Sequence, residues 1–124
     1  MQNGDTPLAL ACRLGYLKAA SKLISLGADP HIRDRDGNTL LLIAAAQGHS
    51  DLIEFLFQRN VANILDENKE GNNALMEAAR NERVDSALLL LKRGAEFTET
   101  NKAGNSSYQY CAAVPGLLSQ WVGF

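Results

Sequence analysis

The strongest constraint on the fold is a string of residues that recurs four times along the chain. Its copies begin at Gly4, Gly37, Gly71 and Gly104, and successive glycines are separated by 33, 34 and 33 residues. Each glycine is followed by polar residues and then by an apolar run, most clearly in residues 37–45. A unit of this length buries too little apolar surface to be stable alone, so the copies are expected to stack on one another.

Each copy carries the signals of a turn followed by two helices. Asp34 and Gly37 frame a four-residue turn in which glycine can adopt a positive φ angle, and Thr39 can cap the next helix. In the first helix of the chain, Leu8, Leu10 and Ala11 are expected to face the interior. The predicted helices are Pro7–Arg13, 15–26, Leu40–Gln47, Ser50–Arg59, Ala74–Arg80, Val84–Lys92, Ser106–Ala113 and Leu117–Val122.

An extended arm is expected to join each pair of helices to the next pair. Asn60 and Gly71 are 11 positions apart, whereas Gly27 and Gly37, like Gly94 and Gly104, are 10 apart. The third copy therefore carries one extra residue within 61–69, which can form either a bulge in the arm or a longer tip.

Composition and length are those of one globular domain spanning residues 1–124, with repeats at about 1–28, 29–61, 62–95 and 96–124. The net charge of −2 gives no reason to expect nucleic acid as a partner. The apolar runs are too short to cross a membrane, and no signal-like segment precedes the first copy. We expect a monomer in the cytoplasm, or in the periplasm or outside the cell if a signal peptide has been removed.

No combination of residues in the sequence predicts catalysis, a metal site or a cofactor. His31 lies in an arm and His49 at the turn between two helices, and neither has a second ligand at metal-binding spacing. Cys12 and Cys111 occupy positions that are alanine in the other copies, so they are expected to be small buried residues rather than nucleophiles or a disulfide pair. The glycines recur at the repeat period and are therefore not a nucleotide-binding motif.

These strings resemble the ankyrin-repeat family over essentially the whole chain. The resemblance rests on Thr6-Pro7-Leu8 followed by Leu10-Ala11, on Gly48-His49, and on Gly27-Ala28-Asp29 and Gly94-Ala95-Glu96. It implies an all-α repeat solenoid of stacked helix-turn-helix pairs with β-turn or hairpin arms.

The chain departs from the family pattern at one position in every copy. The family usually has a histidine after its Thr-Pro-Leu motif, and the resemblance implies that this histidine links neighbouring loops. The chain instead has Ala9, Leu42, Met76 and Gln109 there. The polar link must therefore be absent or replaced.

The resemblance also implies a binding face made of the arm tips and the exposed ends of the first helix of each pair. The run Arg33-Asp-Arg-Asp36 is balanced in charge, so it is either a solvated turn or a contact surface. The repeat pattern does not require these residues, so reversing the charges of Arg33 and Arg35 together should weaken binding and leave thermal stability nearly unchanged. The candidate protein-binding residues are Arg33, Arg35, Asp36, Asn38, Ala46, Gln47, Glu67, Lys69, Glu70, Asn72, Arg80, Asn81, Lys102 and Asn105.

From the fold and from the lack of a catalytic motif, we expect a non-enzymatic module that binds a folded protein. Two alternatives remain open at this stage. The chain could inhibit a partner enzyme by capping its active site, in the manner of an immunity protein. It could also be a targeting or scaffold domain cut from a longer enzyme or effector.

Overall fold

The computed structural model describes residues 5–121, which form eight helices and no strand of more than one bridging residue pair. The helices occur in four consecutive pairs, as the repeat predicts. Their bounds are α1 Pro7–Leu14, α2 Leu17–Ser25, α3 Leu40–Gln47, α4 Ser50–Gln58, α5 Ala74–Arg80, α6 Val84–Lys92, α7 Ser107–Ala112 and α8 Leu117–Gln120.

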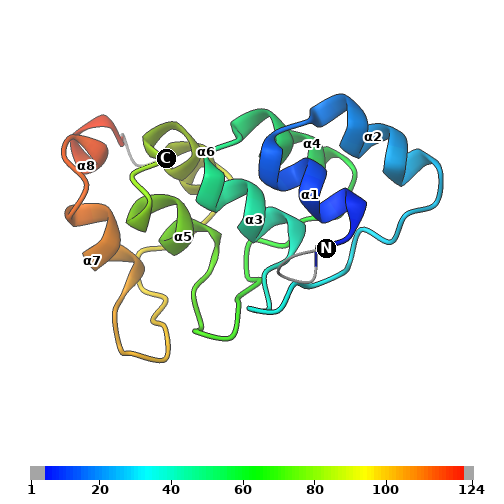
Figure 1. Ribbon diagram of the computed structural model, residues 1–124. Helices are drawn as coiled ribbons and strands as arrows, with labels where there is room; N and C mark the ends of the chain where they lie inside the picture. Colours follow the sequence, from blue (N-terminus) through cyan, green and yellow to red (C-terminus); the bar gives the residue numbers. More distant parts are fainter. Residues whose placement is uncertain (1–4, 122–124) are drawn as a thin grey trace.

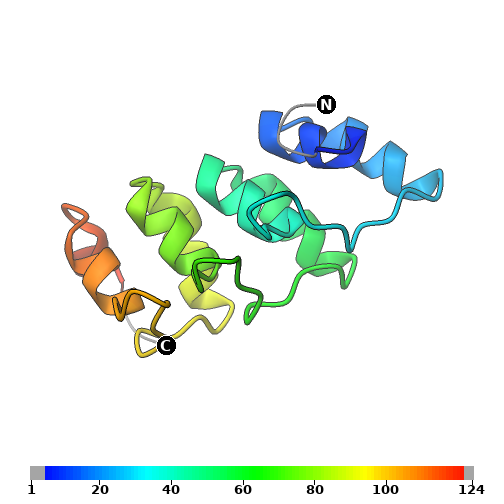
Figure 2. The ribbon, with the colours of Figure 1, turned by 60° about the horizontal axis from the view of Figure 1, so that its bottom comes forward.

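The first helices of the pairs form one row and the second helices form another. Within the first row α1 packs against α3, α3 against α5, and α5 against α7, while α2, α4 and α6 make weaker contacts in the second row (Figures 1 and 2). The arms extend below the helices in Figure 1. This arrangement confirms the predicted all-α repeat solenoid.

Side-chain caps fix the start of every helix in the first row. The side chains of Thr6, Thr39, Asn73 and Ser106 each accept a hydrogen bond from the backbone N–H three residues later, at 2.9–3.4 Å. The predicted helices are all present, and their ends differ by at most two residues within the described part of the chain. The predicted last residue of α8, Val122, lies outside the described residues.

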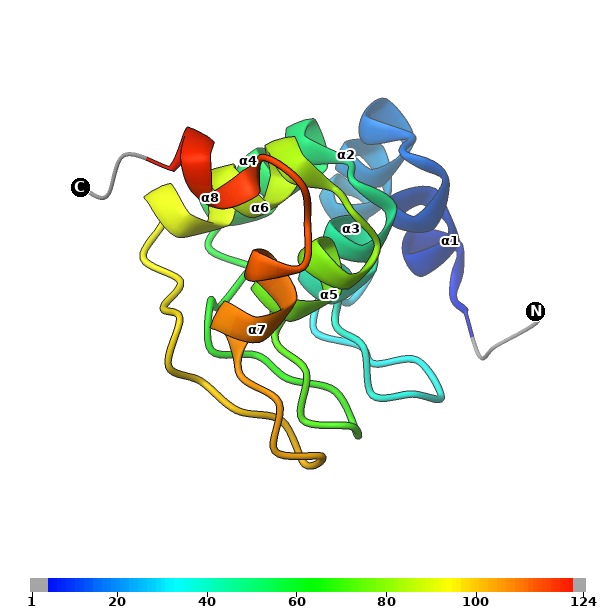
Figure 3. The ribbon, with the colours of Figure 1, turned by 90° about the vertical axis from the view of Figure 1, so that its left-hand side faces the viewer.

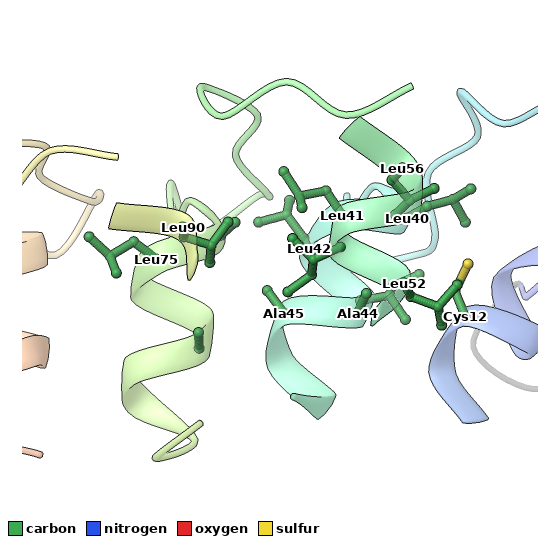
Figure 4. Packing of buried hydrophobic residues seen from close by; sticks show 14 of the residues in the cluster. Cys12, Leu40, Leu41, Leu42, Ala44, Ala45, Leu52, Leu56, Leu75 and Leu90 are labelled. Atoms are coloured by element: carbon green, nitrogen blue, oxygen red, sulfur yellow. The ribbon is translucent and has the colours of Figure 1, made fainter. Parts of the chain in front are cut away.

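The core lies between the two rows and between neighbouring pairs. Leu42, Leu75 and Leu90 are buried in it, and Figure 4 shows them between adjacent repeats. The prediction that Leu10 faces the interior is wrong, because 38% of Leu10 is exposed. Its equivalent in α3, Ile43, is 2% exposed. α3 has helices of the first row on both sides, whereas among residues 5–121 α1 has one on a single side.

Three of the four positions where the family usually has histidine are part of this core. Ala9, Leu42 and Met76 are buried, and the side chain of Gln109 instead accepts from the N–H of Ser106 in a capping box. The three apolar residues therefore contribute to packing, and the links between arms must come from other side chains.

Each described arm ends in the same five-residue tip, at 34–38, 68–72 and 101–105. The first side chain of each tip, Asp34, Asn68 or Asn101, accepts two backbone N–H groups from its own tip at 2.9–3.1 Å. Single antiparallel bridges join Glu67 to Asn73 and Thr100 to Ser106. The arms are thus short hairpins, as expected from the family.

The extra residue of the third repeat is in the segment that descends from α4 and not in the tip. The N–H of Val61 donates to the carbonyl of Leu56 at 2.9 Å, just as that of Ala28 donates to Leu23 at 3.0 Å. Further along, Asn63 Oδ1 accepts the N–H two residues later, as Asp29 Oδ1 does, both at 2.9 Å. Ala62 lies between these two matched positions and is therefore the extra residue.

Candidate protein-binding face

Neighbouring tips are joined through their backbones into a continuous edge. The N–H of Lys69 donates to the carbonyl of Asp36 at 2.9 Å, and the N–H of Lys102 donates to that of Glu70 at 3.0 Å. Together with the internal hydrogen bonds of each tip, these links leave the tip backbone little freedom. Side chains on this edge therefore have defined spacing.

A row of three cations runs along this edge. Arg35, Lys69 and Lys102 occupy the same position in successive tips, two residues before the tip glycine, and all three are exposed. Their side chains make no hydrogen bond or ion pair with the rest of the described chain. We call these three residues the cation row. Asp36 and Glu70 stand next to it and are also exposed.

The other predicted binding residues divide into exposed and partly covered groups. Glu67, Asn105, Arg80 and Asn81 are exposed, whereas Asn38, Ala46 and Gln47 are half-buried. The structure thus brings the tips of three repeats and the ends of α3 and α5 together on the side of the first row of helices (Figure 2).

Arg33 is exposed but is engaged in holding the arms together. Its Nη1 donates to the carbonyl of Gly37 at 2.7 Å in its own tip and to that of Glu67 at 2.8 Å in the next arm. The expectation that charge reversal leaves stability unchanged therefore applies to Arg35 and not to Arg33. The contact with Glu67 depends on stacking, so one repeat read alone gives no sign of it.

Asn72 lies in the interior, only 2% exposed, so its side chain is not available to a partner. It donates to Glu77 Oε2 at 2.9 Å and accepts from Asn101 Nδ2 of the next arm at 2.8 Å. Asn68 donates to the same Glu77 oxygen at 3.2 Å and to Asn38 at 3.0 Å.

These side chains form a polar ladder that links three arms to each other and to the first row of helices. We define the polar ladder as Asn38, Asn68, Asn72, Glu77 and Asn101. It supplies polar links between the arms, and sequence reasoning missed it. The one available signal was the recurrence of asparagine after each tip glycine from Gly37 onward.

A second polar cluster ties the first repeat to the second arm. The guanidinium of Arg13 donates to both carboxylate oxygens of Asp5 at 2.9 and 3.0 Å and to Asp34 at 3.2 Å. The hydrogen bond to Asp5 raises the pKa of Arg13 above its ordinary value, and the contact with Asp34 adds to that shift. Arg13 is therefore a structural cation, although it lies at the end of a first-row helix.

The two histidines and the two cysteines have the structural settings that the sequence predicts. His49 Nε2 lies 3.1 Å from the carbonyl of Arg13, at the end of α1, while His31 is exposed in its arm. Cys12 and Cys111 are free thiols with no exposed surface. Within residues 5–121, no group of three or more His, Cys, Asp or Glu side chains is placed to hold a metal ion.

Both thiols are expected to be unreactive in the folded protein. Burial raises the pKa of Cys12 to about 12 and that of Cys111 to about 11, so almost no reactive thiolate is present at pH 8. A thiol reagent such as DTNB should modify neither residue in native buffer and both in guanidinium chloride. Rapid modification of the native protein would contradict the buried positions.

None of the helices in the described part of the chain combines the length and hydropathy needed to span a bilayer.

Comparison with known proteins gives ankyrin repeats over residues 3–101. A family model of three ankyrin repeats matches residues 22–101, and a single-repeat model matches residues 3–35. An ankyrin repeat protein of Rickettsia felis is 35% identical over 98 residues, covering 77% of this chain and 32% of that protein.

Two animal proteins show similar identity over shorter stretches. Human ankyrin repeat domain-containing protein 63 is 38% identical over 81 residues, covering 63% of this chain and 21% of the relative. Alpha-latroinsectotoxin-Lt1a of Latrodectus tredecimguttatus is 34% identical over 92 residues, covering 74% of this chain and 6% of the toxin. The chain thus spans a third or less of the length of these relatives. By its repeats, its fold and these matches, the chain belongs to the ankyrin-repeat family.

Proposed function

We propose that this chain is a non-enzymatic module that binds a folded protein through its tips and the exposed ends of its first-row helices. Ankyrin repeats are generally modules of protein–protein interaction, and such proteins are typically not enzymes. The observation that carries the proposal for this chain is the cation row, which presents three unpaired charges on a fixed backbone edge.

The charge pattern on the tips favours a protein surface over nucleic acid. Arg35 and Lys69 are each followed by an exposed carboxylate, that of Asp36 or Glu70. A phosphate backbone would be repelled by these carboxylates, whereas a folded protein can place charges of both signs opposite them. A specific complex of this kind buries roughly 1,200–2,000 Å² in total.

Reversing the charge of the cation row should weaken binding without unfolding the protein. The variant combines Arg35→Glu, Lys69→Glu and Lys102→Glu, and the partner is the protein that the wild-type chain retains in affinity capture. We expect the dissociation constant to rise about tenfold or more, because each glutamate would repel the negative charge of the partner that the original cation attracts. The melting temperature should change little. Isothermal titration calorimetry and thermal unfolding measure the two quantities.

A matched control places the same charge change on the second row of helices. Lys18, Lys22 and Lys92 are exposed on α2 and α6, and replacing all three with glutamate alters the net charge equally. This control should keep its affinity within about twofold. If both triple variants lose affinity equally, the effect is one of overall charge, and the proposed face is wrong.

A further inference from the structure

A cavity of about 550 Å³ opens between the second and third arms, within the size range of sites for small molecules and short peptides. Its walls are Pro30, His31 and Arg33 of the second arm and residues 60–64 and Asp66 of the third, and residues 39–41, Phe57 and Arg93 complete it. We call it the central arm cavity. In Figure 3 the segments that descend from α4 and α6 lie on the left, whereas the tips lie at the lower right.

The extra residue of the third repeat lies in the wall of this cavity, which is the largest of three comparable hollows. Equivalent hollows exist beside the second and fourth arms, but their volumes are only about 260 and 110 Å³. Those two arms lack an equivalent of Ala62, which lines the central arm cavity directly. The additional residue lengthens the descending segment of the third arm without changing its tip.

The central arm cavity also differs from its neighbours in charge. Arg33 and Arg93 line it together with one carboxylate, Asp66. The hollow beside the second arm has Asp29 as its charged residue, and the one beside the fourth arm has only the carboxylates of Glu96 and Glu99. Cations are thus confined to the largest of the three.

Both guanidinium groups keep donors that the described chain does not use. Arg93 donates through Nε and Nη2 to Glu54 and stacks 5.0 Å from the centre of the Phe57 ring. Arg33 uses only Nη1, for the two carbonyls that join the arms. Nη1 of Arg93 and Nη2 of Arg33 make no hydrogen bond within residues 5–121. The hydrogen bonds to Glu54, Gly37 and Glu67 and the contact with the Phe57 ring hold the two guanidinium groups in place.

The third arm adds backbone donors to the same wall. The N–H groups of Asn63 and Ile64 have no hydrogen-bond acceptor among the described residues. Asn63 and Ile64 open a turn that the N–H of Asp66 closes by donating to the carbonyl of Asn63 at 3.0 Å, so their own N–H groups can donate to carbonyl oxygens of a bound peptide. Phe57 and Ile64 offer apolar surface beside them.

We propose that the central arm cavity binds an extended acidic peptide segment of a protein partner. A carboxylate of the peptide accepts hydrogen bonds from Arg33 and Arg93, its carbonyl oxygens accept from the N–H groups of Asn63 and Ile64, and an adjacent apolar side chain packs on Phe57. This site is separate from the cation row, so either can fail experimentally without the other.

The test uses two defined probes, the acetylated and amidated pentapeptides Gly-Leu-Glu-Leu-Gly and Gly-Leu-Gln-Leu-Gly. NMR spectra of the 15N-labelled protein are recorded with increasing amounts of each. The glutamate peptide should shift the amides of Phe57, Asn63 and Ile64 with a dissociation constant of about 1 mM or lower, and the glutamine peptide should bind at least about fivefold more weakly. Equal binding of the two, no binding of either, or shifts confined to the tips would overturn the proposal.

Two variants and a control locate the site on the protein. Arg93→Gln removes one guanidinium, and deletion of Ala62 removes the extra residue of the cavity wall and shortens the third arm. Each should weaken the glutamate peptide about fivefold or more. Arg59→Gln is the control, because Arg59 also stacks on a phenylalanine, 5.1 Å from the centre of the Phe55 ring, but does not line the cavity. Loss of binding in the control, or retained binding in Arg93→Gln, would contradict the assignment.

A free small acid distinguishes a peptide site from a site for a metabolite. Titration with 4-phenylbutyrate supplies the carboxylate and the apolar group without a peptide backbone. It should bind more weakly than the glutamate peptide, because it cannot pair with Asn63 and Ile64. Tighter binding of the free acid would show that the occupant is a small molecule and would overturn the peptide proposal.

Discussion

Replacing Glu77 with alanine is expected to lower the free energy of unfolding by about 3 kcal/mol, because the carboxylate satisfies two interior amides at once. Glu77 is 4% exposed, and its Oε2 accepts from both Asn68 and Asn72. Truncation leaves these two side-chain donors without their acceptor in a site that water does not readily reach. Urea denaturation monitored by circular dichroism measures the loss.

The neighbouring arginine provides the control for this prediction. Arg80 Nε donates to Glu77 Oε1 at 3.2 Å, but 48% of the Arg80 side chain is exposed. An exposed ion pair contributes little, so Arg80→Gln should cost less than about 1 kcal/mol. If Glu77→Ala costs no more than Arg80→Gln, the polar ladder does not stabilise the fold.

Replacing Gly71 with alanine should cost about 2–3 kcal/mol, because the change both strains the backbone and separates two tips. Gly71 has a φ of +80°, and a Cβ atom there would lie 2.9 Å from the backbone nitrogen of Lys102. That nitrogen donates to Glu70, so relieving the clash would lengthen the hydrogen bond between the third and fourth tips.

The last tip offers a matched glycine that lacks the second effect. Gly104 has a φ of +85°, and a Cβ atom there would meet nothing within 4 Å in the described part of the chain. Gly104→Ala should therefore cost only the backbone strain, about 1 kcal/mol. Urea denaturation of both variants makes the comparison, and equal losses would mean that close stacking of the tips adds no stability.

The fold could be predicted from the sequence because the information is local and repeated four times. A glycine, a capping residue such as Thr39 and an apolar run are adjacent in the chain, and their recurrence fixes the period of the stack. The error at Leu10 has the same origin. Leu10 and its equivalent Ile43 are both apolar, so the sequence does not distinguish them, but burial also depends on the neighbouring repeat.

The candidate site was harder to predict because it depends on contacts between repeats. Asn38, Asn72 and Asn105 occupy the same position, yet Asn105 is exposed and Asn72 is buried against Glu77. In the sequence Arg33 looks like an unpaired surface charge, because its hydrogen bond to the carbonyl of Glu67 forms only when the next arm lies beside it. The length difference that reveals Ala62 is visible in the sequence, but the cavity that Ala62 lines becomes apparent only when two arms stand side by side.

Lysine footprinting of the complex with the captured partner tests whether the tips form the protein-binding face. The five lysines of the chain are all exposed, with Lys69 and Lys102 on the tips and the other three on α2 and α6. Acetylation rates are measured by mass spectrometry in the free protein and in the complex. We expect the partner to protect Lys69 and Lys102 and to leave Lys18, Lys22 and Lys92 as reactive as before. Protection of these three with Lys69 and Lys102 still reactive would contradict binding through the tips.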